Sequence, residues 1–302
     1  MKNTILYLTT IFIWGSTWLA IKFQLGHVDP IVSILYRFFL AGFLLLAFCI
    51  ITKQRMEFLF KEHLCMALQG LFLFSLNYWA VYTAETYMTS GLVAVAFSLI
   101  VFLNITNGYI FLRTPLNSGT LIGAILGTSG IYLIFMPEIS SFDLSDKNII
   151  GICLGFTGVF LASLGNIISA RNQKNKLPVL QTNAYGMAYG AIIMFIIAFS
   201  LKKNFNFLLT YEYIGSLFYL SVFGSIIAFG CYLTLIGNIG ADRASYAIML
   251  IQPVALCFST FFEGYTWTRN GFLGLILIMA GNLMILKKKS RKNIKRIFKL
   301  SS

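Results

Sequence analysis

Charged residues and proline are scarce in this sequence of 302 residues. Only 11% of the residues are Asp, Glu, Lys or Arg and there are 5 prolines, whereas 58% are hydrophobic and the mean hydropathy is +0.80. In soluble domains roughly a quarter of the residues are charged and close to half are apolar. Because a soluble fold of this length could not bury so much apolar surface, the composition predicts an all-α membrane protein.

Histidine and paired cysteine are also lacking, which argues against a metal site. The five cysteines all lie inside apolar runs without a Cys-x-x-Cys pair, and His27 and His63 are far apart in the chain. Cysteines in such runs act as small packing residues. We therefore expect neither a bound metal nor a cofactor.

Motifs of catalysis and nucleotide binding are absent as well. The sequence has no Walker-type loop, no H-E-x-x-H, no G-x-S-x-G and no paired aspartates within an apolar run. The first absence excludes ATP-driven pumping by this chain alone, and the others argue against an intramembrane enzyme. We expect a protein that is not an enzyme.

The formal net charge of +13 is concentrated near the end of the chain. Eight Lys or Arg residues fall between Lys287 and Lys299, directly after an apolar stretch. A basic cluster beside a membrane helix typically contacts anionic lipids on the cytoplasmic face. We therefore expect a bilayer contact at this tail and no nucleic-acid partner.

Ten apolar runs are long enough to cross a bilayer as helices of about 20 residues. They cover residues 4–21, 31–51, 63–83, 89–112, 116–136, 148–169, 179–201, 212–236, 244–262 and 271–286. With the amino terminus inside, seventeen basic residues lie on the cytoplasmic side and five outside. The positive-inside rule then predicts a multi-pass protein of the inner (plasma) membrane with both termini in the cytoplasm.

The two halves of the sequence resemble each other at an offset near 150 residues. Gly123 and Gly130 in the fifth run match Gly274 and Gly281 in the tenth, and Pro30 in the second matches Pro178 in the seventh. A duplicated unit of five helices has an odd number of crossings, so its second copy must be inverted in the membrane. We therefore predict two inverted five-helix repeats, 1–137 and 148–287, followed by a basic cytoplasmic tail at 288–302, with a substrate site between the repeats.

The sequence resembles the EamA-domain proteins of the drug/metabolite transporter superfamily over essentially its whole length. The resemblance rests on short segments in a fixed order. These are Trp14-Gly15-Ser16 with Lys22, Pro30 with Tyr36-Arg37-Phe38, Thr89-Ser90-Gly91-Leu92-Val93-Ala94, Arg171, and Gln252-Pro253 with Glu263. It implies ten helices in two inverted repeats and export of amino acids, related metabolites or toxic small molecules. The sequence departs from the pattern at Val101, where the ninth run has Pro253, and at Arg113, where a Glu often ends the helix.

Arg37 is the first candidate for a substrate contact. It lies seven residues after Pro30, roughly 10 Å into the membrane at 1.5 Å per residue. A charge at that depth usually faces a cavity or a partner, which suggests contact with an anionic group. The alternative is that Arg37 bonds helix carbonyls or reaches the headgroups.

Buried amides and polar aromatic residues are further candidates. Asn104 lies near the middle of the fourth run, and Asn77 lies with Tyr82 in the third. Amides in hydrocarbon need partners, so they either line the substrate path or bond across helices. Trp14, Ser16, Tyr185 and Tyr189 are further candidates, because aromatic rings with a polar tip suit a small amphipathic substrate. The alternative is packing, since most of the 15 tyrosines and 29 phenylalanines of the chain must be packing or interfacial residues.

Gln252 precedes the one proline inside the ninth run. Pro253 has no amide hydrogen for the carbonyl of Met249, so we expect a kink there. The freed carbonyl and the Gln252 amide could contact substrate or be satisfied by a neighbouring helix.

These observations favour a secondary transporter of a small-molecule substrate that works by alternating access. Proton coupling has little support, because no Asp or Glu falls at the middle of a span. The alternatives are a non-transporting sensor or channel subunit and, with the catalytic motifs absent, an intramembrane enzyme.

Overall fold

The computed structural model describes residues 2–24, 26, 28–87, 93, 96–140, 146–263 and 267–298. The regular structure within these residues is helical, with no strand. The elements are α1 (Lys2–Lys22), α2 (Pro30–Ile51), α3 (Phe60–Leu71), η1 (Phe72–Leu76), α4 (Asn77–Ala84), α6 (Ile100–Leu112), α7 (Ser118–Ile134), α8 (Met136–Ser140), α9 (Asp146–Lys174), α10 (Val179–Ser200), α11 (Tyr211–Tyr219), η2 (Leu220–Ile227), α12 (Ala228–Ile239), α13 (Ala241–Ala244), α14 (Tyr246–Glu263) and α15 (Arg269–Phe298).

The ten predicted spans correspond to helices in the described part of the chain, which confirms the all-α fold. The third and eighth spans are each continuous through a π-helical segment, α3 to η1 to α4 and α11 to η2 to α12. Five segments are each long and apolar enough to cross a membrane: Pro30–Ile51, Phe60–Ala84, Asn148–Lys174, Val179–Ser200 and Tyr211–Ile239. Thr89 to Leu92, which open the fourth predicted span, and residues 299–302 lie outside the described residues.

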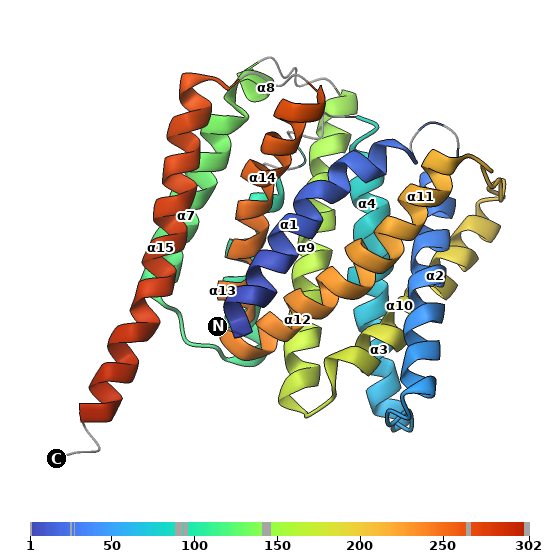
Figure 1. Ribbon diagram of the computed structural model, residues 1–302, viewed down its shortest axis with the longest axis horizontal. Coiled ribbons are helices and arrows are strands. Elements are labelled where there is room, and N and C mark those ends of the chain that lie inside the picture. The colour runs from blue at the N-terminus through green and yellow to red at the C-terminus, as the bar shows by residue number, and fades with distance from the viewer. Residues whose placement is uncertain are drawn as a thin grey trace.

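The helices pack in pairs that join the two repeats. α2 packs on α10 at one side of the bundle and α7 on α15 at the other, while α1, α9, α12 and α14 lie between them (Figure 1). α1 contacts α12 and α14, and its counterpart α9 contacts α4 and α6. The α1–α12 and α1–α14 contacts are therefore matched by the α9–α4 and α9–α6 contacts, as expected for two inverted copies of one unit.

The glycines that revealed the repeat face each other where α7 crosses α15. A Cβ on Gly130 would lie 2.5 Å from the carbonyl oxygen of Gly274, and a Cβ on Gly281 would lie 2.8 Å from that of Gly123. Small residues let membrane helices approach closely enough for backbone contact. These glycines are conserved between the halves of the chain because a larger side chain would separate the two helices.

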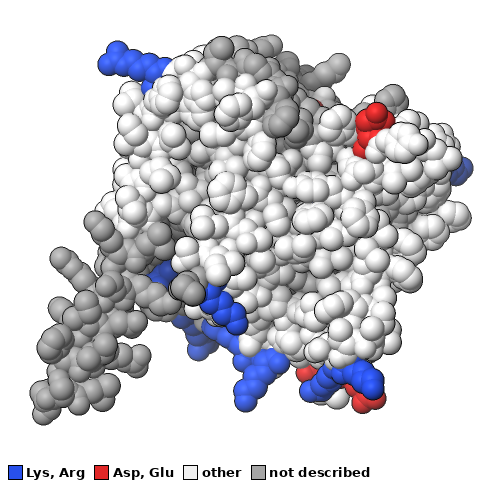
Figure 2. All heavy atoms as spheres, viewed as in Figure 1, with Lys and Arg blue, Asp and Glu red and all other residues white. Residues whose placement is uncertain are grey.

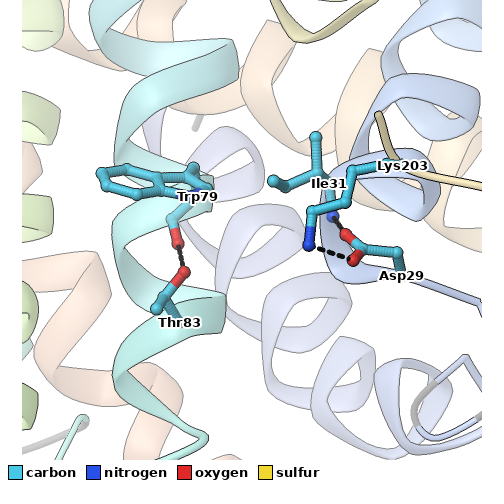
Figure 3. Close-up of polar contacts among 5 residues, drawn as sticks. All are labelled: Asp29, Ile31, Trp79, Thr83 and Lys203. Atoms are coloured by element: carbon cyan, nitrogen blue, oxygen red, sulfur yellow. Dashed lines mark hydrogen bonds and ion pairs between the residues drawn. The ribbon is translucent and has the colours of Figure 1, made fainter. Parts of the chain in front are cut away.

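The start of α2 is fixed by polar contacts near one end of the bundle. Asp29 caps the helix by accepting a hydrogen bond from the amide of Ile31 at 2.9 Å, and its carboxylate lies 2.8 Å from the ammonium of Lys203 (Figure 3). On α4, Thr83 donates to the carbonyl of Trp79 at 2.7 Å in the same view. This cap sets the depth of α2, because the residues that follow are placed by the helical rise from it.

Charged side chains gather at the two ends of the visible face and leave an uncharged band between them (Figure 2). Large apolar side chains are exposed on the outer helices, as at Phe43 on α2 and Phe199 on α10, which are 61% and 70% exposed. An apolar band between charged ends is the surface expected of a protein that crosses a bilayer.

Candidate functional site

A cavity of about 140 Å³ lies among helices of both repeats. The side chains that line it come from α1, α2, η1, α4, α6, α9, α12 and α14, and Glu85 and Phe97 line it from just outside α4 and α6. Five of the residues predicted from the sequence meet here: Trp14, Arg37, Asn77, Tyr82 and Gln252. Residues from distant parts of the chain thus line one cavity.

Arg37 is the charged centre of this cavity and is only 2% exposed. Its Nε donates to Ser225 Oγ at 2.9 Å, its Nη2 lies 3.5 Å from the hydroxyl of Tyr78, and its guanidinium carbon lies 5.0 Å from the Tyr78 ring centre. Among the described residues, no carboxylate forms an ion pair with it. The cavity therefore holds a buried positive charge whose partners are hydroxyl groups and ring faces.

Arg37 lies on α2 and is hydrogen-bonded by η2, one of two π-helical segments at equivalent positions of the repeats. Ser225 in η2 and Ser75 in η1 are 150 residues apart, and each donates to the carbonyl five residues earlier, at 3.0 and 3.1 Å. Ser221 in η2 also donates to the backbone carbonyl of Arg37 at 3.1 Å. Short π-helical segments within α-helices often occur at functional sites.

Aromatic rings form the wall next to this charge. The Trp14 ring centre lies 4.9 Å from that of Phe229 and 5.1 Å from that of Tyr232. The Trp14 indole donates to the carbonyl of Gly224 in η2 at 3.0 Å. The wall is thereby attached to the same segment that binds Arg37.

The other predicted residues of the cavity are buried amides and a tyrosine. Asn77 donates to the carbonyl of Leu73 at 3.4 Å, and the Tyr82 ring centre lies 6.3 Å from that of Tyr78. Gln252 is 5% exposed and lies beside Pro253, which is inside α14. These three residues line the cavity from two helices, α4 and α14.

Four predicted residues lie elsewhere. Ser16 shares a 2.6 Å hydrogen bond with the hydroxyl of Tyr219, and Asn104 donates to the carbonyl of Ala241 at 3.3 Å and lines a second cavity. Tyr185 donates to the carbonyl of Met56 at 2.9 Å, and the Tyr189 hydroxyl lies 2.9 Å from His63 Nδ1.

The second cavity, of about 500 Å³, lies beyond the first along α9 and α12. Asn166 of α9 lines the first cavity and Ala170, one helical turn later, lines the second. On α12, Tyr232 lines the first and Ile236 the second. Ile167, next to Asn166, also lines the second cavity, so the two spaces adjoin along α9.

Sequence reasoning missed several residues of the first cavity. Tyr78, Phe229 and Asn166 line it but were not among the predicted site residues. The spacing of Tyr78, Tyr82 and Glu85 on one face of the third span could have indicated a lining stripe. The described residues contain no group of three or more His, Cys, Asp or Glu that could hold a metal.

Comparison with known proteins finds similarity to transporters over most of the chain. Residues 1–136 and 149–287 match the EamA-like transporter family. An "Uncharacterized transporter YoaV" from Bacillus subtilis (strain 168) is 24% identical over 284 residues, 93% of this chain and 96% of the relative. An "Uncharacterized inner membrane transporter YedA" from Escherichia coli (strain K12) is 27% identical over 280 residues, 91% of this chain and 88% of the relative. One solved crystal structure has a similar fold, with a TM-score of 0.79, 14% identity and coverage of 96% and 98% of the two chains.

Proposed function

Because the chain belongs to the EamA-like transporter family, we propose that it is a secondary transporter that moves small carboxylate-bearing metabolites, amino acids above all, by alternating access. The first cavity is the proposed substrate site. It is lined from both repeats, as is usual for substrate sites of inverted-repeat transporters.

The observation that carries this proposal is the environment of Arg37. A buried charge is costly unless it is paired, and the partners of Arg37 within the described chain are uncharged. A substrate carboxylate would supply the missing anion, and the planar guanidinium can hold it through two parallel bonds. Arg37 would then bind the substrate more strongly than any uncharged group of the cavity.

The two neighbouring cavities support the alternating-access part of the proposal. A carrier needs a site whose two barriers open in turn, and here the first cavity adjoins the second along α9 and α12. Tyr232 and Asn166 lie at this boundary and share a hydrogen bond of 3.2 Å. Separation of α9 from α12 would connect the two spaces.

We further propose that both termini are cytoplasmic, that the basic tail contacts anionic lipids, and that transport is outward. The start of α1 and the end of α15 lie toward the same end of the bundle (Figure 1). Seventeen basic residues fall on the cytoplasmic side in this orientation and five outside. The positive-inside rule supports that choice.

Counterflow in proteoliposomes tests the transport proposal. Vesicles containing the purified protein and unlabelled L-leucine should accumulate external radiolabelled leucine with saturable kinetics, whereas protein-free vesicles should not. Leucine is the first probe because its apolar side chain suits an aromatic wall. Saturable flux confined to compounds that lack a carboxylate would reject the role given to Arg37.

A further inference from the structure

The amide of Asn166 is a second polar group of the first cavity with an unused hydrogen-bonding atom. Asn166 is 1% exposed, and its Nδ2 donates to the Tyr232 hydroxyl at 3.2 Å. Its Oδ1 is buried and accepts no hydrogen bond from the described residues. A buried acceptor without a donor costs free energy, so this oxygen is suited to a donor carried by a ligand.

The rings around Asn166 favour a positively charged donor. Trp14, Phe229 and Tyr232 line the same cavity. The ring centre of Trp14 lies 4.9 Å from that of Phe229 and 5.1 Å from that of Tyr232. Aromatic faces attract cations, and an amide oxygen accepts readily from an ammonium group. This part of the cavity therefore has the opposite preference from Arg37.

The spacing of these two groups can be read along the eighth span. Arg37 bonds Ser225 and Asn166 bonds Tyr232, which follows seven residues later, or about two helical turns along the same span. The two polar groups are therefore held at different levels of one span, and both line the same cavity. A molecule with a carboxylate and an amine a few bonds apart suits such a pair.

Glu85 is the alternative partner for an amine, because it also lines the cavity. It lies just after α4, seven residues beyond Tyr78, which contacts Arg37, and burial raises the pKa of its carboxyl to about 7. Near neutral pH only part of the Glu85 carboxyl groups therefore carry a charge, which weakens the attraction of this residue for an ammonium. The unpaired oxygen of Asn166 is present at every such pH.

We propose that Asn166 binds the amine of the substrate, so that the cavity takes a zwitterion, an α-amino acid with its carboxylate at Arg37 and its ammonium at Asn166 Oδ1. The proposal rests on the function proposed above, in which this cavity is the substrate site. It adds the second recognition group and separates amino acids from simple carboxylic acids as substrates.

The test is equilibrium binding of three related probes to the purified full-length protein in detergent. The probes are L-leucine, 4-methylpentanoate, which lacks the amine, and 3-methylbutylamine, which lacks the carboxylate. Wild type should bind leucine roughly 10- to 100-fold more tightly than 4-methylpentanoate, as expected for one hydrogen bond to a charged group. Asn166→Leu should reduce leucine affinity to that of 4-methylpentanoate and leave the affinity for 4-methylpentanoate unchanged.

Asn107→Leu is the matched control. Asn107 is also a buried asparagine, it donates to Ser163 Oγ at 2.9 Å, and it does not line the cavity. This variant should keep the wild-type ratio of leucine to 4-methylpentanoate affinity. If Asn166→Leu does not fold, the isosteric Asn166→Asp should raise that ratio, because its anion attracts the ammonium and repels a carboxylate.

Several results would overturn the proposal. They are equal affinity of wild type for leucine and 4-methylpentanoate, an unchanged ratio in the Asn166 variants, or loss of the ratio in Glu85→Gln instead. Binding of 4-methylpentanoate but not leucine would reject the amine contact and leave the carboxylate site intact. If neither carboxylate probe bound, the function proposed for the cavity would fail as well.

Discussion

Replacing Arg37 by methionine should abolish leucine binding yet change the free energy of unfolding little. In the folded protein the guanidinium gains a charge-assisted bond to Ser225 at 2.9 Å, worth about 1.5–3 kcal/mol, and ring contacts with Phe38 and Tyr78 at 5.4 and 5.0 Å, worth about 0.5–2 kcal/mol together. Against these stands the desolvation of a fully buried ion, which costs several kcal/mol. The terms cancel to within about 2 kcal/mol, and methionine fills a similar volume without a charge.

The assay pairs thermal unfolding with binding on the same purified samples. A change of up to about 2 kcal/mol should move Tm by less than about 8 °C for a chain of this size. Loss of two charge-assisted bonds to a carboxylate should weaken leucine binding by at least about 100-fold. Arg37→Lys keeps the charge but loses the planar guanidinium that can bind a carboxylate through two hydrogen bonds. This variant should fold and bind leucine with intermediate affinity.

The opposite pattern would refute this reasoning. If Arg37 anchored the bundle, Arg37→Met should destabilise the protein by about 3–5 kcal/mol, as removal of one partner from a buried ion pair does. Lysine should then restore both stability and binding. A stable Arg37→Met protein with wild-type leucine affinity would also exclude Arg37 from the site.

Four further predictions concern Gly224, Glu85, Pro253 and the carboxyl terminus. A Cβ on Gly224 would lie 3.2 Å from Nη2 of Arg37, so Gly224→Ala should displace the guanidinium and weaken leucine binding, whereas Gly230→Ala, with nothing within 4 Å, should bind as wild type. Burial raises the pKa of Glu85 from 4.5 to about 7, so as pH rises the carboxyl of the unfolded chain loses its proton before that of the folded protein. Tm should therefore fall as pH rises from about 4.5 to about 7 and level off above it. The variant Glu85→Gln should show a smaller fall. Pro253→Ala restores a backbone bond inside α14 and should slow counterflow without unfolding; unchanged flux at equal expression would make the proline dispensable. A reporter fused to the carboxyl terminus should be active only in the form that reports the cytoplasm, and an external tail would refute the proposed orientation.

The helices could be predicted from the sequence because hydrocarbon leaves the backbone little choice. A run of about 20 apolar residues must satisfy its own amides and carbonyls, and a helix does so within the segment. The π-helical segments could not be predicted in this way, since they preserve the apolar run and change only which carbonyl each amide reaches. Ser75 and Ser225 are the one trace they leave in the sequence, as polar residues at the same place in both halves.

The site was harder to predict because periodicity gives a face of a helix and not its neighbour. Arg37 was recognisable by the cost of its charge, whatever lay opposite. Tyr185 and Tyr189 share a face of α10 just as regularly, but that face meets Met56 and His63 near α3. Asn104 and Asn166 are similar amides in similar runs, and only the packing against α12 shows which of them lines the first cavity.

The duplication also explains why the charged site occurs once in a protein built from two copies of one unit. Position 224 in η2 and position 74 in η1 are equivalent, and they carry Gly and Phe. Gly224 leaves room for the guanidinium of Arg37, whereas Phe74 fills the equivalent space by packing on Gly186 and Gly190 of α10, where an added Cβ would lie 3.1 and 2.9 Å from its side chain. A large residue faces small ones in both cases, but only one interface contains a charge. The two halves can therefore keep the same fold while only one of the two interfaces places a charge in the proposed substrate site.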